Sequence, residues 1–415
     1  PGDKPVAAPI KAGPRAPVDW AFEASDIPVD PAFRFGKLDN GMRFAIRKNA
    51  TPAGTAIVRL EVAAGSLDEA EHERGLAHFV EHMAFNGSTN VPEGEMVRLL
   101  ERKGLAFGAD TNAETAFERT TYKLDLPRND PDLLDTALML MRETASELTI
   151  TPEAVERERG VLLSELRDRN TYAFRNAVDE ARFAYPHAHY TQRFPIGSAE
   201  TLQAASAEDL RGFYTREYVP AQATVVVIGD FDPDRVEAEI RRHFASWQPR
   251  ETDGQPDPGP VDPRDAGRTA IHLDPALPER ITAARHGPWL DEPDTIAQRQ
   301  ENLLRQIGYA IVNRRLARLS RQESPPFRDA GFGTGTVFKA ARTTRLIVDT
   351  ADRKWQRGLA EAVREYRHAL AFGFSEGEVA EQVANIRRDV ENNAVPADTR
   401  SHVALLGSVW ALLRE

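Results

Sequence analysis

A proline- and glycine-rich stretch at residues 249–267 divides this sequence into a longer first part and a shorter second part. The stretch contains five Pro and three Gly and almost no apolar side chains. Such a composition supplies little for a hydrophobic core and is typical of a linker between packed units. We therefore expect a flexible arm at 1–30, a first domain at 31–248, the linker at 249–267 and a second domain at 268–415.

Both predicted domains mix strand patterns with helix patterns. Asn40-Gly41 separates two apolar runs, which is the strongest short signal for a β-hairpin. Further strands are expected at 55–64, 120–126 and 223–229, and helices at 75–85, 97–103, 130–147, 152–168, 206–214 and 232–244. After the linker, strands are expected near 269–273, 280–286, 331–337 and 345–349, and helices at 295–319, 353–372 and 375–392. This partly repeated order predicts two related α+β domains that arose by internal duplication.

The composition excludes several classes of protein. The 53 basic and 64 acidic residues give a net charge of −11, which argues against general binding to nucleic acid. The chain has no cysteine, so disulfide scaffolds, thiolate catalysis and cysteine metal sites are excluded. Any metal must therefore be bound by His and carboxylate side chains. No stretch approaches the roughly 20 apolar residues that a membrane-spanning helix needs.

The two ends of the sequence suggest processing and a larger assembly. The chain begins at Pro1 with a Pro- and Ala-rich segment, which resembles the arm that follows a cleaved export signal. We therefore expect an exported, periplasmic protein. The apolar positions of residues 403–413 predict an amphipathic helix that needs a surface to cover and has no Gly or Pro stop signal. The second domain is therefore expected to be incomplete at its C-terminal end.

Residues 75–88, GLAHFVEHMAFNGS, carry the strongest chemical signal. His78 and His82 are four positions apart, so on a helix both imidazoles lie on one face and can reach one ion. Neutral imidazoles are good Zn²⁺ ligands, and a water bound to such an ion has its pKa lowered toward ~7. Glu81 lies close to the same face and can accept a proton and deliver it to a leaving amine. The order H-x-x-E-H is the inverzincin motif, whereas the alternative is a helix with two half-buried histidines.

The residues around the motif extend this signal. Gly65-Ser66 and Glu69 precede it, and together with G-x-A-H-F-x-E-H-M-x-F-x-G-[ST] they resemble the signature of the pitrilysin/insulinase family of zinc peptidases. The resemblance covers residues 33–244, and the region after the linker is similar to the family's second, non-catalytic repeat. It implies two related domains, each a mostly antiparallel sheet with helices packed on one face. Together they would form one half of a clamshell peptidase.

The resemblance also implies a third zinc ligand on a later helix. The family carries an E-x-E-[RK]-x-V run there, whose first Glu binds the metal, and this Glu corresponds to Glu156. Glu158 is the competing candidate, and its alternative role is a solvated salt bridge. Gly160, one turn after Glu156, is expected to leave room for a neighbouring helix and the ion. Glu165 is expected either to orient a ligand histidine without touching the metal or to be an exposed charge.

A second matching stretch is residues 108–122, which contain the family's N-A-x-T segment. In the family this segment is an exposed edge strand, to which a peptide substrate adds through backbone hydrogen bonds. By this resemblance, Asn112, Ala113 and Thr115 line the substrate cleft near the metal. The alternative is an ordinary transition from loop to strand, with Asn as a turn residue.

The resemblance therefore implies a zinc-dependent endopeptidase with one Zn²⁺ per chain, which hydrolyses peptides or unfolded polypeptides in an enclosed chamber. His78, His82 and Glu156 would bind the metal, and Glu81 would act as general base and then as acid. Family members close the chamber with a second two-domain half, which would be a continuation of the chain, a separate subunit or a homodimer mate. The alternatives are a catalytically inactive structural subunit of the same fold and a peptide-binding module without hydrolysis.

Overall fold

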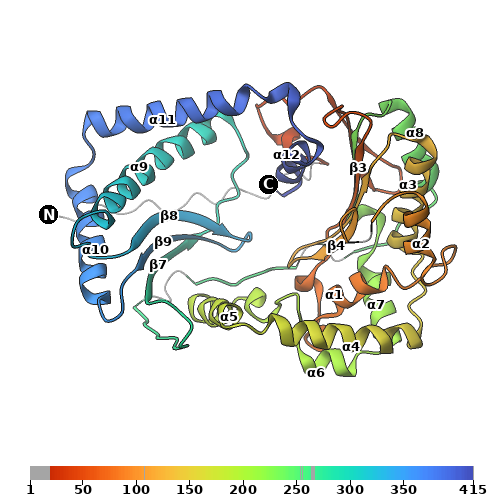
Figure 1. Cartoon of the computed structure of the whole chain (residues 1–415), viewed down its shortest axis with the longest axis horizontal. Helices are drawn as coiled ribbons and strands as arrows, with labels where there is room; N and C mark the ends of the chain where they lie inside the picture. Colours follow the sequence, from red (N-terminus) through yellow and green to blue (C-terminus); the bar gives the residue numbers. More distant parts are fainter. Residues whose placement is uncertain (1–18, 107, 253, 255, 263–266, 415) are drawn as a thin grey trace.

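The computed structural model describes residues 19–106, 108–252, 254, 256–262 and 267–414. The first 18 residues of the predicted arm, and residues 253, 255 and 263–266 of the predicted linker, lie outside the described residues. Figure 1 shows two units, each built on one sheet, toward opposite ends of the molecule. Both units combine a mostly antiparallel sheet with runs of helices, so the predicted α+β class is confirmed.

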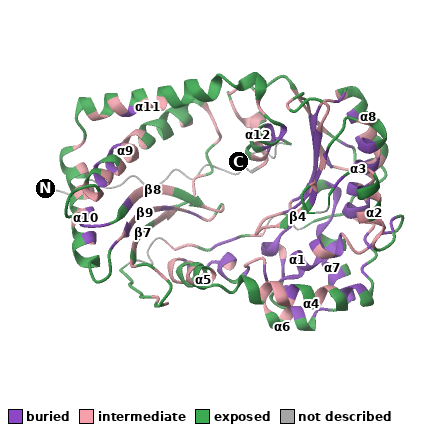
Figure 2. Ribbon diagram, viewed as in Figure 1, coloured by how far each residue is buried: buried purple, intermediate pink, exposed green. Residues whose placement is uncertain are grey.

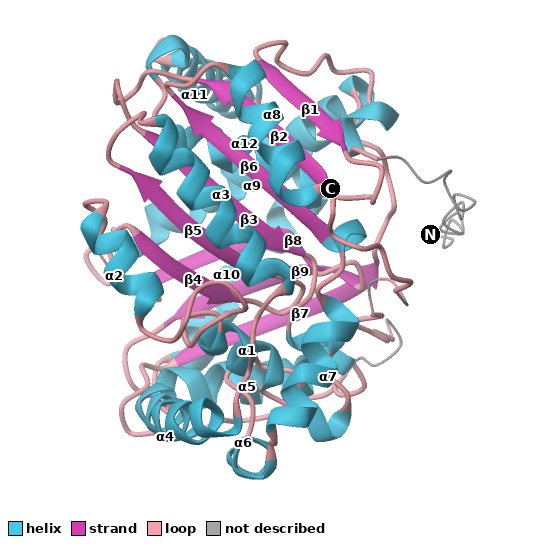
Figure 3. Ribbon diagram, turned by 90° about the vertical axis from the view of Figure 1, so that its right-hand side faces the viewer, coloured by secondary structure: helices cyan, strands magenta, loops and turns pink. Residues whose placement is uncertain are grey.

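The first unit contains a six-stranded sheet in the order β1-β2-β6-β3-β5-β4, which Figure 3 shows from the side of its covering helices. The β2–β6 pair is parallel and the other neighbouring pairs are antiparallel. The central strands β3 and β6 are buried along their whole length, as their largely apolar, β-branched sequences predict. The strands are β1 (Phe33–Lys37), β2 (Arg43–Lys48), β3 (Ala56–Val62), β4 (Thr111–Thr115), β5 (Thr120–Leu126) and β6 (Ala223–Gly229).

Helices α1, α3 and α8 cover one face of this sheet and share the largest hydrophobic core with it. Predicted start signals begin several helices: Thr151 accepts a hydrogen bond from Ala154 N at 3.3 Å, and Ser206 caps α7. The helices of this unit are α1 (Leu76–Met83), α2 (Glu95–Arg102), α3 (Pro131–Ser146), α4 (Pro152–Arg169), α5 (Tyr172–Ala184), α6 (Ala199–Ala204), α7 (Ala207–Glu217) and α8 (Pro233–Phe244). Within the described ranges, no helix is both long and apolar enough to cross a bilayer.

The opposite face of the first sheet is covered by the two ends of the described chain. Helix α12 (His402–Arg414) buries Leu405, Leu406 and Val409 against β6 and β3, on the inner side of the sheet in Figure 1. Trp20 is buried in the same cluster, and Phe22 packs against it. This part of the predicted arm is therefore packed against the sheet. The predicted terminal helix thus exists, but the surface that it covers belongs to this chain. The first sheet therefore carries helices on both faces rather than on one.

The second unit contains a three-stranded antiparallel sheet in the order β7-β9-β8. This is the same arrangement that β3, β5 and β4 have in the first sheet. Its core is smaller and lies between the sheet and helices α9 and α10, while α11 packs on α9 and is mostly exposed in Figure 2. The elements are β7 (Arg280–Pro288), α9 (Ile296–Ser320), β8 (Asp329–Val337), β9 (Ala341–Asp349), α10 (Trp355–Phe372) and α11 (Glu376–Ala394).

The strand predicted at 269–273 does not form. The chain runs instead along α5, where His272 Nδ1 lies 3.2 Å from Asp179 Oδ2 and Arg175 pairs with Asp274 at 2.8 Å. Ile271 and Leu273 point to solvent, each with 86% of its surface exposed. A sequence that favours β structure is therefore not sufficient to form a strand here, because this segment pairs with no strand among the described residues.

Candidate metal centre

The short helix α1 begins at a position that only a glycine fits easily. Gly75 has φ +101°, and a Cβ there would lie 2.9 Å from Leu202 Cδ2 and 3.0 Å from Gly197 Cα. Glu69, fully buried, accepts a hydrogen bond from Ala77 N at 2.9 Å and satisfies one free N–H of the first turn. Burial raises the pKa of Glu69 well above its usual value. These contacts fix the start of the helix that carries the motif.

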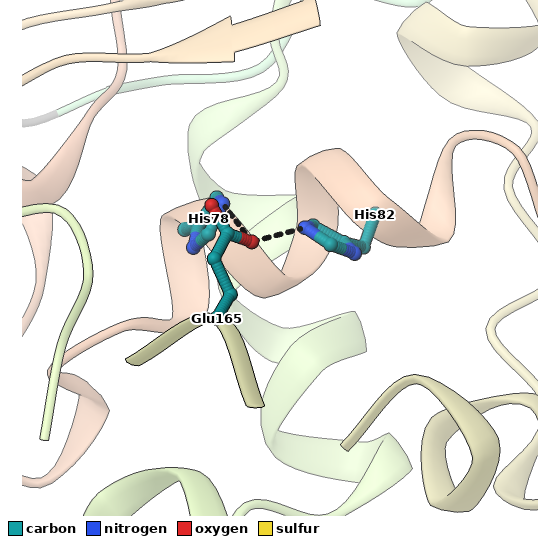
Figure 4. Close-up of side chains that lie close together, drawn as sticks. All are labelled: His78, His82 and Glu165. Carbon is teal, nitrogen blue, oxygen red and sulfur yellow. Dashed lines mark ion pairs between the residues drawn. The ribbon is translucent and has the colours of Figure 1, made fainter. Parts of the chain in front are cut away.

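His78, His82 and Glu165 converge on one point, as Figure 4 shows. Glu165 Oε2, from α4, lies 3.7 Å from His78 Nε2 and 3.5 Å from His82 Nε2. Two ligand atoms that share a tetrahedral Zn²⁺ at 2.0–2.1 Å lie roughly 3.3 Å apart, so the arrangement is close to that of a metal site. Burial lowers the pKa of His78 to about 3, which keeps its imidazole neutral, the form that binds metal. The chemistry of the donor set therefore fits zinc.

The third acidic group at this point is Glu165 and not Glu156, which corrects the sequence prediction. Glu156 is 70% exposed and pairs with Arg159 at 2.7 Å. Glu165 lies nine residues after Glu156, which is two and a half turns of helix, so their side chains point to opposite sides of α4. Gly160 is exposed, and a Cβ there would meet nothing within 4 Å, so it makes no room for an ion. The resemblance named Glu156, whereas tertiary packing decides which side of α4 faces α1 and places Glu165 beside the two histidines.

Glu158 supports the site from behind His82. Its Oε2 lies 3.1 Å from His82 Nδ1, which leaves Nε2 of the same ring directed toward Glu165. Burial by itself would lower the pKa of His82, but the hydrogen bond to Glu158 and the neighbouring carboxylates raise it overall. The sequence analysis named Glu158 as the competing candidate for the third ligand, and the structure places it beside the ring of His82. The seven-residue spacing of Glu158 and Glu165, two turns of one helix face, is the signal that could have predicted it.

Glu81 lies beside the converging ligands and is connected to strand β4. Thr115 Oγ1 donates a hydrogen bond to Glu81 Oε2 at 2.6 Å. Burial raises the pKa of Glu81, and the hydrogen bond from Thr115 offsets part of this effect. A buried carboxylate held this way can accept a proton from a group in the site.

Strand β4 is an edge of the sheet, as the sequence resemblance implied. Hydrogen bonds from Ala116 N to Arg119 O and from Asp125 N to Asp110 O, both 2.8 Å, show that even-numbered residues of β4 pair with β5. The backbone groups of Ala113 and Thr115 therefore point to the outer edge, where no described strand pairs with β4. Asn112 is exposed and alternates to the sheet face opposite Thr115, and its Oδ1 accepts a bond from Ala113 N at 2.9 Å. Ala113 and Thr115 thus lie at the free edge, whereas the Asn112 side chain does not face Glu81.

A second group of possible ligands among the described residues is Asp135, Glu239 and His243. There the guanidinium of Arg242 pairs with both carboxylates. The cation already present makes this group less suited to a metal than the group on α1 and α4.

Comparison with known proteins agrees with this geometry. The family model described as insulinase, peptidase family M16, matches residues 44–193, which include α1 and α4. The model described as the peptidase M16 inactive domain matches residues 204–386. The chain belongs to peptidase family M16. The resemblance stated from the motif is thereby confirmed, and the converging ligands of this M16 chain all lie in the insulinase match.

Named relatives of this M16 chain include proteases and also a subunit of the mitochondrial cytochrome b-c1 complex of Bos taurus, which is 28% identical over 67% of this chain and 56% of that protein. The chain is 34% identical over 225 residues to the probable zinc protease PqqL of Haemophilus influenzae. This aligned segment covers 54% of this chain and 24% of that protein. Its structure is similar to the periplasmic protease PqqL of Escherichia coli, with a TM-score of 0.86 and 25% identity over 93% of this chain and 42% of that one. The first half of the same protease gives a TM-score of 0.80 at 24% identity, over 92% of this chain and 82% of that half. The M16 chain thus spans about a quarter of the length of the Haemophilus influenzae protein. In fold, it corresponds to one half of a clamshell.

Proposed function

We propose that this chain is the zinc-binding half of a metalloendopeptidase. The observation that supports this function most directly is the convergence of His78, His82 and Glu165 beside the buried Glu81. In this proposal the three converging residues hold one Zn²⁺, and Glu158 keeps His82 in the required orientation. When bound, zinc lowers the pKa of a coordinated water and polarises the peptide carbonyl.

The chain's own groups suit the proton transfers of peptide hydrolysis. Glu81 accepts the proton of the attacking water and delivers it to the leaving amine. Thr115 holds the carboxylate of Glu81 on the side of strand β4. A flexible peptide would add to the free edge at Ala113 and Thr115 by backbone hydrogen bonds, which gives broad tolerance of side chains. Since strand addition needs an extended backbone, unfolded polypeptides are the expected substrates.

The complete enzyme needs a second half, in our proposal. A single wall of a cleft leaves the far side of the substrate in water, where it is neither oriented nor sheltered. The likeness to the first half of a longer periplasmic protease supports both a second two-domain half and an exported location. The rival function is an inactive subunit, since residues 204–386 match a domain described as inactive. That match lies outside α1 and α4, so we favour the peptidase.

The test replaces Glu81 by Gln in protein assembled with its second half. The amide keeps the size of the side chain but cannot accept the proton, so cleavage of a flexible fluorogenic peptide should fall at least a hundredfold. Zinc content should stay near one per chain. The matched control is Glu114→Gln on β4, whose exposed side chain alternates to the face opposite Thr115 and should leave turnover unchanged. A wild-type protein that holds zinc but cleaves no peptide would instead support the inactive subunit.

A further inference from the structure

The second unit contacts the first at the turn that follows the edge strand. Phe338, in the turn between β8 and β9, lies 5.1 Å from Phe117 and 4.9 Å from Tyr190 between ring centroids. Phe117 is part of the turn between β4 and β5, two residues after Thr115. Figure 1 shows the β8–β9 turn directed from the second unit toward the first. The contact therefore connects the second unit to the strand that carries Thr115.

Phe338 occupies an unfavourable backbone conformation. Its φ is +46°, in the left-handed region that residues other than glycine seldom adopt. Such a conformation persists only where the surrounding contacts impose it. The contacts here are a cluster of aromatic and apolar side chains from both units, namely Leu67, Phe117, Tyr185, Tyr190, Val337 and Phe338. The β8–β9 turn is closed by its own hydrogen bond from Ala340 N to Val337 O at 3.2 Å, and it packs against this surface of the first unit.

The turn at Phe117 is also held from its own unit. Leu67 N donates to Phe117 O at 2.8 Å, and Ser66 N donates to Ala116 O at 3.1 Å. Gly65 permits this close approach, because a Cβ there would lie 2.4 Å from Ala116 O. The backbone of the turn is therefore anchored by residues 65–67. Its aromatic side chain packs against Tyr190 and Phe194 of its own unit and against Phe338 of the second unit.

The position of this turn affects the site through Thr115. Thr115 Oγ1 donates to Glu81 at 2.6 Å, and its backbone groups lie at the free edge of β4. A shift of the turn would move both the hydrogen bond to Glu81 and the edge to which a peptide adds. Displacements of about 1 Å far from the chemistry can cost a hundredfold in rate.

We propose that Phe338 is a positioning residue. Through it, the second unit would hold β4 where Thr115 can donate its hydrogen bond to Glu81. This inference rests on the proposed peptidase function. It gives the second unit a role in peptide binding and turnover, although that unit holds no group of converging ligands among its described residues.

The experiment compares Phe338→Ala with a matched control in the zinc-loaded protein assembled with its second half. The control is Phe372→Ala, which removes the same side chain from a site in the second unit that is 77% exposed. We expect Phe338→Ala to lower kcat/KM about tenfold, with a raised KM, and to leave zinc content and the control unchanged. Phe338→Tyr keeps the ring and should restore activity. Phe117→Ala should give at least as large a loss, because it also removes the ring contacts with Tyr190 and Phe194. The double variant should lose no more activity than Phe117→Ala alone, because the contact between Phe338 and Phe117 is then already absent.

Hydrogen exchange provides a readout that does not depend on activity. Amides of residues 111–117 should exchange faster in Phe338→Ala than in the wild type and in Phe372→Ala. If the wild type cleaves no peptide, the proposed function fails, while exchange still tests the contact. Unchanged exchange at 111–117 together with unchanged kcat/KM in a folded Phe338→Ala protein would overturn the proposal. If that variant does not fold, Phe338→Leu replaces it with the same expected outcomes.

Discussion

At the scale of single residues, three of the four glutamates of helix α4 differ in their surroundings. Glu165 faces both histidines, Glu158 contacts His82 Nδ1, and Glu156 lies on the far side of the helix beside Arg159. If the proposed zinc site is correct, Glu165 would contact the ion, Glu158 would hold a ligand histidine and Glu156 would remain in solvent. The three carboxylates should then contribute very differently to metal binding. The three positions therefore test the assignment of the site.

We expect Glu165→Gln to reduce zinc to less than a tenth of one ion per chain, because a neutral amide is a weaker ligand than a carboxylate. Glu158→Gln should weaken zinc affinity by about 10–100-fold, as is typical when the partner of a ligand histidine is lost. Glu156→Gln serves as the control and should bind zinc like the wild type. Zinc content after dialysis and competition with a chelator measure all three, and a loss of zinc in Glu156→Gln alone would reverse the assignment.

Asp68 makes stability depend on pH. Burial raises its pKa from 3.8 to about 7, while its carboxylate accepts a bond from Gly65 N at 2.8 Å. As pH rises from about 4 to about 7, the unfolded chain loses this proton before the folded protein does, so the folded state becomes less stable. The largest expected effect is about 4 kcal/mol. Asp68→Asn keeps an acceptor and stays neutral, so its thermal midpoint should exceed that of the wild type at pH 8 but not at pH 4. Equal differences at both pH values would contradict the raised pKa.

At the scale of elements, two glycines on neighbouring helices differ in what a methyl group would meet. Gly75 precedes α1 at φ +101° with close neighbours, whereas Gly160 is helical, exposed and free of neighbours within 4 Å. The first is required by the backbone at the start of the helix that carries His78 and His82, and the second only weakens α4.

We therefore expect Gly75→Ala to destabilise the first unit by about 2 kcal/mol, from the left-handed conformation and the contact with Gly197. Zinc occupancy should fall with it, since α1 carries both histidines. Gly160→Ala should stabilise the protein by about 0.5–1 kcal/mol, because alanine favours the helix. Urea unfolding followed by circular dichroism measures both changes, and stabilisation by Gly75→Ala would disprove the structural role of its φ.

At the scale of the whole molecule, the two units and the two ends of the described chain are joined by packing. Trp20 and α12 cover the inner face of the first sheet, although they lie at opposite ends of the sequence. The terminal helix therefore finds its partner within this chain and is no argument for a missing one. The case for a second half rests instead on the similarity to one half of a longer protease.

We expect the isolated 415-residue chain, loaded with zinc, to cleave a flexible peptide at least tenfold more slowly than the chain assembled with its second half. The reason is that one wall binds the metal but does not orient the far side of the substrate or exclude water. Zinc content, measured in both preparations, is the control and should be equal. Equal turnover by a demonstrated monomer would exclude the need for a second half.

The sequence by itself determined the features that depend on neighbouring residues. The spacing of His78 and His82 places both on one helix face, Asn40-Gly41 forms the predicted hairpin, and the flanking residues identify the family. Only the tertiary structure decided features that depend on distant segments. It turned Glu165 toward α1, left 269–273 without a partner strand, and brought Phe338 to Phe117. The reason is that helix periodicity and turn geometry are local, whereas the orientation of α4 and the pairing of strands depend on packing between residues far apart in the chain.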